Sequence, residues 1–389
     1  MIHHEKNAPF RAGAALDIGT TTVQAQLIDL DTTEILDNFS ALNDQRIFGA
    51  DVISRISAAR DGKINGLFSA INNQTENILK QFILKWKLGN IEKCSVSGNT
   101  TMLHLFCRAD PSAMGSAPYT PSFLEERDFE GKEISLSAEN IKLLPGISAF
   151  IGADITAGLA YIEIMSKEKN ALFVDIGTNG EIAVWKENEK CLFCCSTAAG
   201  SCFEETEITC GLSAAAFIDA IAEMKSKSVI DETGALADEF ILKGFPVTHL
   251  DEYSSNSESL SAANIHKEKK FISQKEIRRF QLAKSAIYSG IKTLCQTASI
   301  KLTEIGAAYI AGRLGTNLNL KNAALTGLLP AEIIEKASAC GNTSLLGAAR
   351  SLTDMSFPLR CREIIAHAET VELASNKYFA AAFTHNMYI

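Results

Sequence analysis

The sequence of 389 residues lacks an excess of positive charge, since 37 Lys and Arg face 46 Asp and Glu and leave a net charge of −9. A protein of this charge repels polyanions, which argues against nucleic acid or an anionic membrane surface as the main partner. The chain also lacks a basic start followed by an apolar leader. Its longest apolar stretch, residues 146–165, is interrupted by Asp154 and Glu163, which argues against a membrane span. We therefore expect a cytoplasmic protein.

The ten cysteines and seven histidines lack the spacing of a metal site. Five cysteines cluster in the sequence and raise the alternative of a zinc or iron–sulfur site: Cys191, Cys194, Cys195, Cys202 and Cys210. The first three fall on a predicted strand, where neighbouring side chains point to opposite faces. No second Cys-x-x-Cys, His pair or ferredoxin-type run accompanies them. We therefore predict reduced, mostly buried thiols and expect no iron–sulfur cluster in this chain.

The length of the chain exceeds what one hydrophobic core usually supports, so we expect two domains. Each half opens with the same pattern of three short strands. In the first half, two strands lie within residues 13–30 and the third lies at residues 34–41. In the second half, the three strands lie at residues 171–175, 181–186 and 192–197. The pattern indicates a duplicated topology, with domains at residues 1–165 and 166–389.

A shared motif lies at the first hairpin of each half. It reads LDIGTTTV at residues 16–23 and VDIGTNGE at residues 174–181. An apolar strand ends in Asp17 or Asp175, and a glycine then reverses the chain. Such a turn presents backbone N–H groups that can cradle a phosphate, while the Asp can hold a hydrated Mg²⁺. The alternative is a pair of turn-capping aspartates, but the two copies favour a nucleotide phosphate held by both halves.

Three further segments are candidates for the same site. Asp154 lies in an apolar stretch, and a buried carboxylate must be hydrogen-bonded, paired or metal-linked; we favour metal or water orientation over a helix cap. AGRLG at residues 311–315 follows a predicted strand, and its glycines would admit an adenosine, although a plain turn explains the segment equally well. SGNTT at residues 97–101 is either an anion-binding helix start or an ordinary N-cap.

The remaining pattern predicts the framework around these segments. Helices are expected over residues 67–86 and 213–224, and a capping box at Ser273 and Glu276 begins a long helix. Residues 109–145 are rich in Pro, Ser and charge and indicate a surface excursion, residues 147–151 predict a strand, and residues 331–338 predict a helix.

These motifs carry a resemblance. The two DIGT turns and AGRLG resemble the phosphate 1, phosphate 2 and adenosine motifs of the acetate and sugar kinase, heat-shock chaperone and actin superfamily. Other segments are similar to those of ATP-dependent reductive activators of corrinoid proteins: FGADVISRI at 48–56, VSGNTTM at 96–102, APYTP at 117–121, LPGISAF at 144–150, SQKEIR at 273–278 and QLAKSAI at 281–287. The resemblance implies an α/β fold of two ribonuclease-H-like, actin-like ATPase lobes. Each lobe would be a mixed sheet with flanking helices, with a nucleotide cleft between the lobes.

The resemblance also implies roles for individual residues. Asp17 and Asp175 would position Mg²⁺, partly through water, and Asp154 would orient the attacking water. The phosphates of ATP would be held by Gly19, Thr20, Thr21, Thr22, Gly177, Thr178, Asn179 and Gly180. The adenosine would face Gly312, Arg313 and Gly315, with Arg313 at a position where the family usually has a second glycine.

The implied activity is the ATP-dependent return of a corrinoid methyl-carrier protein from Co(II) to Co(I). Family members commonly carry an iron–sulfur domain, and no cluster motif is evident in this sequence, so we expect a separate low-potential electron donor. The expected partners are a corrinoid protein and its methyltransferase, and a homodimer is compatible with the family. The alternatives are a non-redox, nucleotide-dependent regulatory module for a corrinoid protein or methyltransferase, and a small-molecule kinase.

Overall fold

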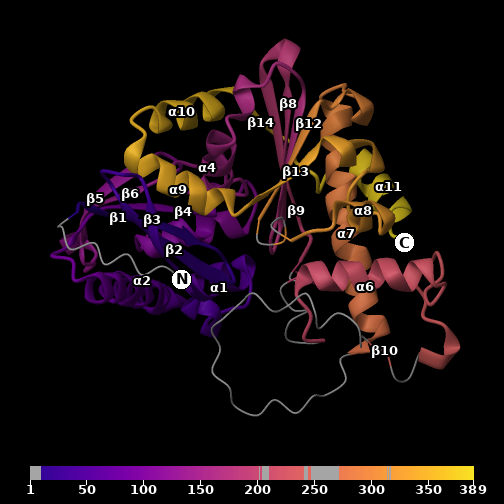
Figure 1. Cartoon of the computed structure of the whole chain (residues 1–389), viewed down its shortest axis with the longest axis horizontal. Helices are drawn as coiled ribbons and strands as arrows, with labels where there is room; N and C mark the ends of the chain where they lie inside the picture. The colour runs from indigo at the N-terminus through magenta and orange to yellow at the C-terminus, as the bar shows by residue number, and fades with distance from the viewer. Residues whose placement is uncertain are drawn as a thin grey trace. The chain divides into compact units, whose positions relative to one another are not determined.

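The computed structural model, drawn in Figure 1, describes residues 10–200, 202–203, 210–240, 244–246, 271–312, 314 and 317–389. Its internal contacts divide the chain into two units. Unit 1 comprises Met1–Lys167 and Asn342–Glu369, and unit 2 comprises Glu168–Gly341 and Thr370–Ile389. The chain therefore passes between the units three times, and each unit is described by itself below.

Unit 1 is built on a six-stranded mixed sheet with the strand order β3-β2-β1-β4-β6-β5. The strands are β1 (Ala12–Ile18), β2 (Thr22–Asp29), β3 (Ile35–Leu42), β4 (Ile91–Gly98), β5 (Arg127–Glu130) and β6 (Ala138–Leu143). The first three form an antiparallel meander, whereas β1, β4 and β6 run parallel. The central strand β1 is buried along almost its whole length, as expected for a strand covered on both faces.

Two expectations for this unit are wrong. The sequence predicts a surface excursion over residues 109–145, but β5 and β6 lie there, and β6 is an interior strand between β4 and β5. The polar residues that alternate with its buried Ile141 and Leu143 conceal the strand in the sequence. The strand expected at residues 147–151 is a tight turn, in which the N–H groups of Ile147 and Ser148 donate to Ile151 O at 2.9 and 3.0 Å.

Helices cover both faces of this sheet, with α9 and α10 on one side and α2 on the other in Figure 1. The helices of unit 1 are α1 (Val52–Ala58), α2 (Ile64–Trp86), α3 (Thr100–Phe106), α4 (Ala153–Tyr161), α9 (Thr343–Thr353) and α10 (Phe357–His367). Helix α9 packs on β1, β4 and α4, so residues 342–369 group with the first half of the chain. The sequence analysis places them in the second domain, because the contacts of α9 with β1, β4 and α4 join residues far apart in the chain and leave no local pattern.

Unit 2 repeats the arrangement with the strand order β13-β12-β7-β8-β9-β14. The strands are β7 (Ala171–Ile176), β8 (Gly180–Lys186), β9 (Cys191–Thr197), β12 (Ala307–Ala311), β13 (Ala337–Gly341) and β14 (Ala368–Thr370). The order β9-β8-β7-β12-β13 matches β3-β2-β1-β4-β6, with the same strand directions. The predicted duplication and α/β fold class are thus confirmed. The helix predicted at residues 331–338 is instead a 3₁₀ turn, Ala331–Lys336, that leads into β13.

The helices of unit 2 include the long α7, which packs on β8 and β9. The described elements are α6 (Ala214–Ser226), α7 (Gln274–Thr297), α8 (Leu320–Leu325), α11 (Lys377–His385) and a short strand pair, β10 (Phe245–Pro246) and β11 (Phe271–Ile272). The predicted capping box of Ser273 and Glu276 is present. Within the described ranges, no helix is both long enough and apolar enough to cross a membrane.

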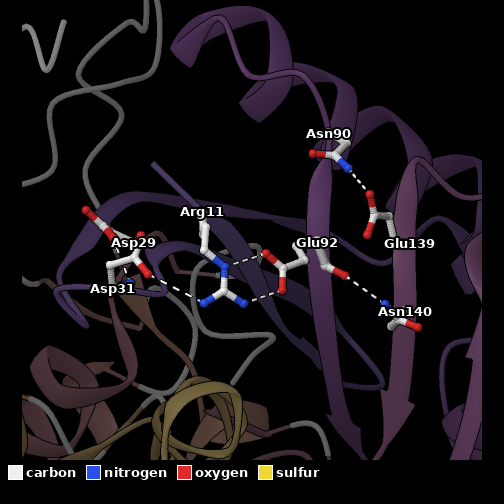
Figure 2. Close-up of polar contacts among 7 residues, drawn as sticks. All are labelled: Arg11, Asp29, Asp31, Asn90, Glu92, Glu139 and Asn140. Carbon is white, nitrogen blue, oxygen red and sulfur yellow. Dashed lines mark hydrogen bonds and ion pairs between the residues drawn. The ribbon is translucent and has the colours of Figure 1, made fainter. Parts of the chain in front are cut away.

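The two ends of the parallel strands in unit 1 differ in chemistry. Figure 2 shows the amino ends, where the guanidinium of Arg11, just before β1, donates to both carboxylate oxygens of Glu92 in β4. Arg11 also lies 3.5 Å from Asp31, and Asn140 of β6 donates to Glu92 O at 3.4 Å. These surface contacts join three strands at one end of the sheet, whereas Asp17 lies at the opposite, carboxyl end of β1.

Candidate functional site

The turn after β1 is held by side chains that bond its carbonyl groups. Asn43 donates from Nδ2 to Gly19 O at 2.8 Å and from its backbone N–H to Thr21 O at 2.8 Å. Arg55 donates from Nη2 to Thr20 O at 2.6 Å. In a planar trans peptide the C=O and N–H point in opposite directions, so the N–H groups that follow Gly19 and Thr20 point away from Asn43 and Arg55. This is the orientation that a phosphate-binding turn requires.

Arg55 is a residue that the sequence analysis did not assign to the site. It lies in α1 with no exposed surface, and its guanidinium donates to Gly49 O at 3.0 Å and lies 3.1 Å from Met102 Sδ. A buried guanidinium must make its hydrogen bonds within the protein, and one of them goes to the turn carbonyl of Thr20. A lone arginine within the apolar FGADVISRI segment was the only sequence signal for this role.

Asp17 lies at the carboxyl end of β1, opposite Gln24 of β2 and Ser97 of β4 in the sheet register. Asn342 donates to its Oδ2 at 2.7 Å, and Ser344 donates to its Oδ1 at 2.7 Å. Burial raises the pKa of Asp17, while the two hydrogen bonds oppose that rise. Both oxygens of this half-buried carboxylate therefore accept hydrogen bonds from residues at the start of α9.

Asp154, in the first turn of α4, lies close enough to Asp17 for the two charges to interact. A Cβ on Gly152 would lie 2.6 Å from Asn99 Cα and 2.8 Å from Asp154 Oδ1, so only glycine permits this close approach. Asn99 in turn donates to Thr20 Oγ1 at 3.0 Å. Burial and the negative charge of Asp17 both raise the pKa of Asp154, so the predicted residues Asp17, Thr20 and Asp154 gather at one end of the sheet.

This donor set fits Mg²⁺. Mg²⁺ is bound through one or two carboxylates, with several waters and substrate phosphates completing its shell. Asp17 supplies hard oxygen donors, and a cation would offset the negative charge of Asp17 that, after burial, raises the pKa of the neighbouring Asp154. Across the part of the chain that the structure describes, no three His, Cys, Asp or Glu side chains are grouped to hold a metal alone. The site therefore suits a hydrated, phosphate-bound ion rather than an all-protein metal cage.

The second turn, after β7, is shaped by glycines. Gly177 N–H donates to Asn179 O at 3.0 Å and closes the turn. Gly312 has φ +86°, and a Cβ there would lie 2.6 Å from both Asp175 Oδ1 and Ile176 O. The parallel pairing of β12 with β7 produces this approach, because it places Ala311 opposite Asp175. The predicted residues Asp175 and Gly312 are therefore neighbours.

Of the other predicted residues of unit 2, some lie within the described structure and some do not. Gly180 begins β8, where a Cβ would lie 2.7 Å from Thr197 Oγ1. Thr178 and Asn179 are half-buried in the turn. Arg313 and Gly315 lie outside the described residues, so their adenosine role stays a prediction.

The cysteines follow the prediction of buried thiols. Seven of the ten are buried: Cys94, Cys194, Cys195, Cys202, Cys210, Cys295 and Cys361. Burial raises the pKa of Cys194 and Cys195, adjacent residues of β9, so both are protonated at neutral pH. Neutral buried thiols behave as small apolar side chains of the core.

A cavity of about 390 Å³ lies elsewhere in unit 1, between the end of α4 and α10. Its charged lining residues are Glu163, Arg360 and Glu363. None of the predicted site residues lines it, so the candidate chemistry does not coincide with this cavity.

Comparisons with known proteins agree with the geometry. Two family models match almost the whole chain: the RACo middle region at residues 12–167, and the C-terminal domain of RACo, the ASKHA domain, at residues 169–217 and 213–389. The corrinoid activation enzyme RamQ of Eubacterium limosum is 29% identical over 98% of this chain and 71% of its own length. A Co(II) methylated amine-specific corrinoid protein reductase of Methanosarcina barkeri is 24% identical over 97% of this chain and 75% of its own.

One solved structure resembles the whole described architecture. It is a reductive activator for corrinoid, iron–sulfur protein, with a TM-score of 0.87 and 28% identity over 99% of this chain and 67% of that protein. The family models match both halves, and the structural match extends through both. The resemblance drawn from the sequence motifs is confirmed, and the chain belongs to the RACo family of corrinoid-protein activators.

Proposed function

We propose that this protein binds Mg–ATP through its two DIGT turns and uses it to help return a corrinoid protein from Co(II) to Co(I). The observation that carries the proposal is the match with a reductive activator at a TM-score of 0.87 over 99% of the chain. The relatives of Eubacterium limosum and Methanosarcina barkeri, named for corrinoid activation and Co(II) corrinoid protein reduction, support the same partner class.

The proposed roles follow the two turns. Asp17 and Asp175 orient the water shell of Mg²⁺, and Asp154 orients the water that attacks the terminal phosphate. The turn residues Thr20, Thr21, Thr22, Thr178, Asn179 and Gly180 hold the phosphates, while Gly312, Arg313 and Gly315 face the adenosine. When bound, Mg²⁺ supplies positive charge that stabilises the charge developing on the phosphate oxygens. The carboxylates gathered in unit 1, with their raised pKa values, support this assignment.

The redox step requires one electron for each cobalt, which passes from Co(II) to Co(I). We propose that a separate low-potential donor protein supplies this electron. ATP binding and hydrolysis, which consumes one water and releases ADP and phosphate, would shift the protein between states that differ in affinity for the corrinoid partner. A state that binds the Co(I) form of the partner more tightly than the Co(II) form would make the otherwise unfavourable reduction more favourable.

The test is ATP turnover with and without a Co(II) corrinoid protein. The proposal expects phosphate release that the corrinoid protein stimulates and that Asp17→Ala abolishes. Asp128→Ala, which removes an exposed carboxylate of β5, serves as the control. Binding of ATP without turnover in either condition would contradict the proposal and favour a nucleotide-sensing binding module. Phosphate transfer to a small molecule would favour a kinase.

A further inference from the structure

The first turn of α9 holds Asp17 with an amide that has little freedom to move. Asn342 is the residue at which the chain re-enters unit 1. Its Nδ2 donates to Asp17 Oδ2 and to Gln24 Oε1, each at 2.7 Å, and its Oδ1 accepts from Leu345 N–H at 2.9 Å. Both amide hydrogens and the amide oxygen are thus engaged. A flipped amide would place its oxygen against the Asp17 carboxylate, which only accepts, so the Asp17 contact selects the observed orientation.

Ser344 hydrogen-bonds the other oxygen of the Asp17 carboxylate. Its Oγ lies 2.7 Å from Asp17 Oδ1 and 2.9 Å from Ser97 Oγ. A hydroxyl has a single hydrogen and an ionised carboxylate only accepts, so Ser344 donates to Asp17 and Ser97 donates to Ser344. Ser344 is 3% exposed and Ser97 is fully buried, which shields this chain of hydrogen bonds from competing water.

The two bonds fix the rotation of the Asp17 carboxylate. One donor on each oxygen defines the carboxylate plane, and each oxygen keeps a second lone pair for another partner. The start of α9 also favours negative charge at this point, because helix N-termini carry partial positive charge. Groups that hydrogen-bond a metal-ligating carboxylate orient it and tune metal affinity. A purely structural role would require only that Asp17 have hydrogen-bond partners, and not that its carboxylate be held in one plane.

We propose that Asn342 and Ser344 are positioning residues that orient the Asp17 carboxylate toward the Mg²⁺ of bound ATP. The inference rests on the proposed function and deepens it by adding a part of the site that lies 325 residues from Asp17 in the sequence. Neither side chain touches the nucleotide in this account, so both act through Asp17 alone.

The test separates Mg²⁺-dependent from Mg²⁺-independent nucleotide binding. ATP affinity is measured by calorimetry with Mg²⁺ and again with EDTA, for the full chain and its Asn342→Ser and Ser344→Ala variants. Serine is itself a good N-cap, so Asn342→Ser keeps the cap of α9 and removes the amide N–H groups that reach Asp17 and Gln24. Asn376→Ser changes another N-cap in the same way, and Ser351→Ala removes a hydroxyl from the same helix that bonds Ser95.

We expect both test variants to weaken ATP binding about tenfold in Mg²⁺ and to leave binding in EDTA unchanged. The control variants should match the wild type in both conditions. In an Asp17→Asn background, Asn342→Ser should add no further loss, because its target carboxylate is already absent. Thermal unfolding of every variant checks that it folds, and Asn342→Thr provides a second capped variant with the same expectation.

Equal losses in Mg²⁺ and EDTA, or no loss in either, would overturn the positioning role. An additive loss in the Asp17→Asn background would overturn it as well. Wild-type binding separates this failure from that of the proposed function. If the wild type binds Mg–ATP and the variants behave like it, only the inference is wrong; if the wild type binds no Mg–ATP, both are wrong.

Discussion

The two DIGT turns share a sequence motif but are built differently. In both hairpins the Asp faces a polar residue across the strand pair, Gln24 for Asp17 and Glu181 for Asp175. The first turn separates the paired residues Ile18 and Val23, whereas the second separates Ile176 and Gly180 and is one residue shorter. The same four letters therefore lead into turns of different size, with their Gly and Thr inside each turn.

The means of holding the two turns also differ. The first turn is tied by hydrogen bonds from Asn43, Arg55 and Asn99, which come from other elements of unit 1. Close backbone approach shapes the second turn, with no room for a Cβ at Gly312 or Gly180. It occurs at the first turn as well, where a Cβ on Gly98 would lie 2.6 Å from Ile18 O. We therefore expect the first turn to respond to the loss of its distant donors, and the second to respond to an added methyl group at Gly312.

Replacing Arg55 should have the largest effect on stability. Arg55→Met keeps the bulk of the side chain but leaves the buried carbonyl of Thr20 and the half-buried carbonyl of Gly49 without this donor. We expect a loss of about 3 kcal/mol in the free energy of unfolding, measured by urea denaturation. Arg108→Met, at an exposed arginine, should change it little. Equal effects at the two positions would show that the first turn does not depend on its side-chain ties.

Adding one methyl group should disturb the second turn. Gly312 and Gly62 both have left-handed backbone, at φ +86° and +83°, but only Gly312 has atoms within reach of a Cβ. Gly62→Ala should cost about 1 kcal/mol from backbone strain alone. Gly312→Ala should cost about 1 kcal/mol more through the clash with Asp175 and should also weaken ATP binding. Equal losses in chemical denaturation would contradict the close-approach account.

The Asp154 carboxyl near the first turn should make the stability of the nucleotide-free protein depend on pH. Burial and Asp17 raise the pKa of Asp154 from 3.8 to about 7. Because the pKa of Asp154 is higher in the folded than in the unfolded state, the protonated carboxyl stabilises the folded protein. This contribution is complete below about pH 4 and is lost as the pH rises through about 7. The melting temperature should therefore fall by a few degrees more between about pH 5 and 8 than in Asp154→Asn. A parallel decline in the two proteins would sink this account, and Mg–ATP should flatten the wild-type decline.

The smallest effect is expected at the opposite end of the same sheet. The Arg11 contacts of Figure 2 are solvent-exposed, and exposed ion pairs contribute little to stability. Arg11→Ala should leave Mg–ATP affinity unchanged and the melting temperature close to that of the wild type. A marked loss of ATP affinity would mean that the two ends of the parallel strands are not independent.

Local patterns made much of the fold and part of the site predictable. The hairpins, the DIGT turns and the capping box at Ser273 depend on neighbouring residues, so sequence order alone reveals them. The strand β6 was concealed by the polar residues between its buried positions. Asn342 and Ser344 could not be connected with Asp17, because their bonds span 325 and 327 residues. The hydrogen bonds of Asn43 and Arg55 to the first turn span 24 and 35 residues, which is also beyond the range of a local sequence pattern.

The most direct test of the central claim follows cobalt itself. A Co(II) corrinoid protein is mixed anaerobically with a low-potential one-electron donor, this protein and Mg²⁺, and the Co(I) absorbance is recorded with ATP or ADP. The account predicts that Co(I) accumulates with ATP and wild-type protein, and not with ADP or with Asp17→Ala. Co(I) formation that is equally fast without ATP, or its absence while the wild type binds and hydrolyses ATP, would contradict it.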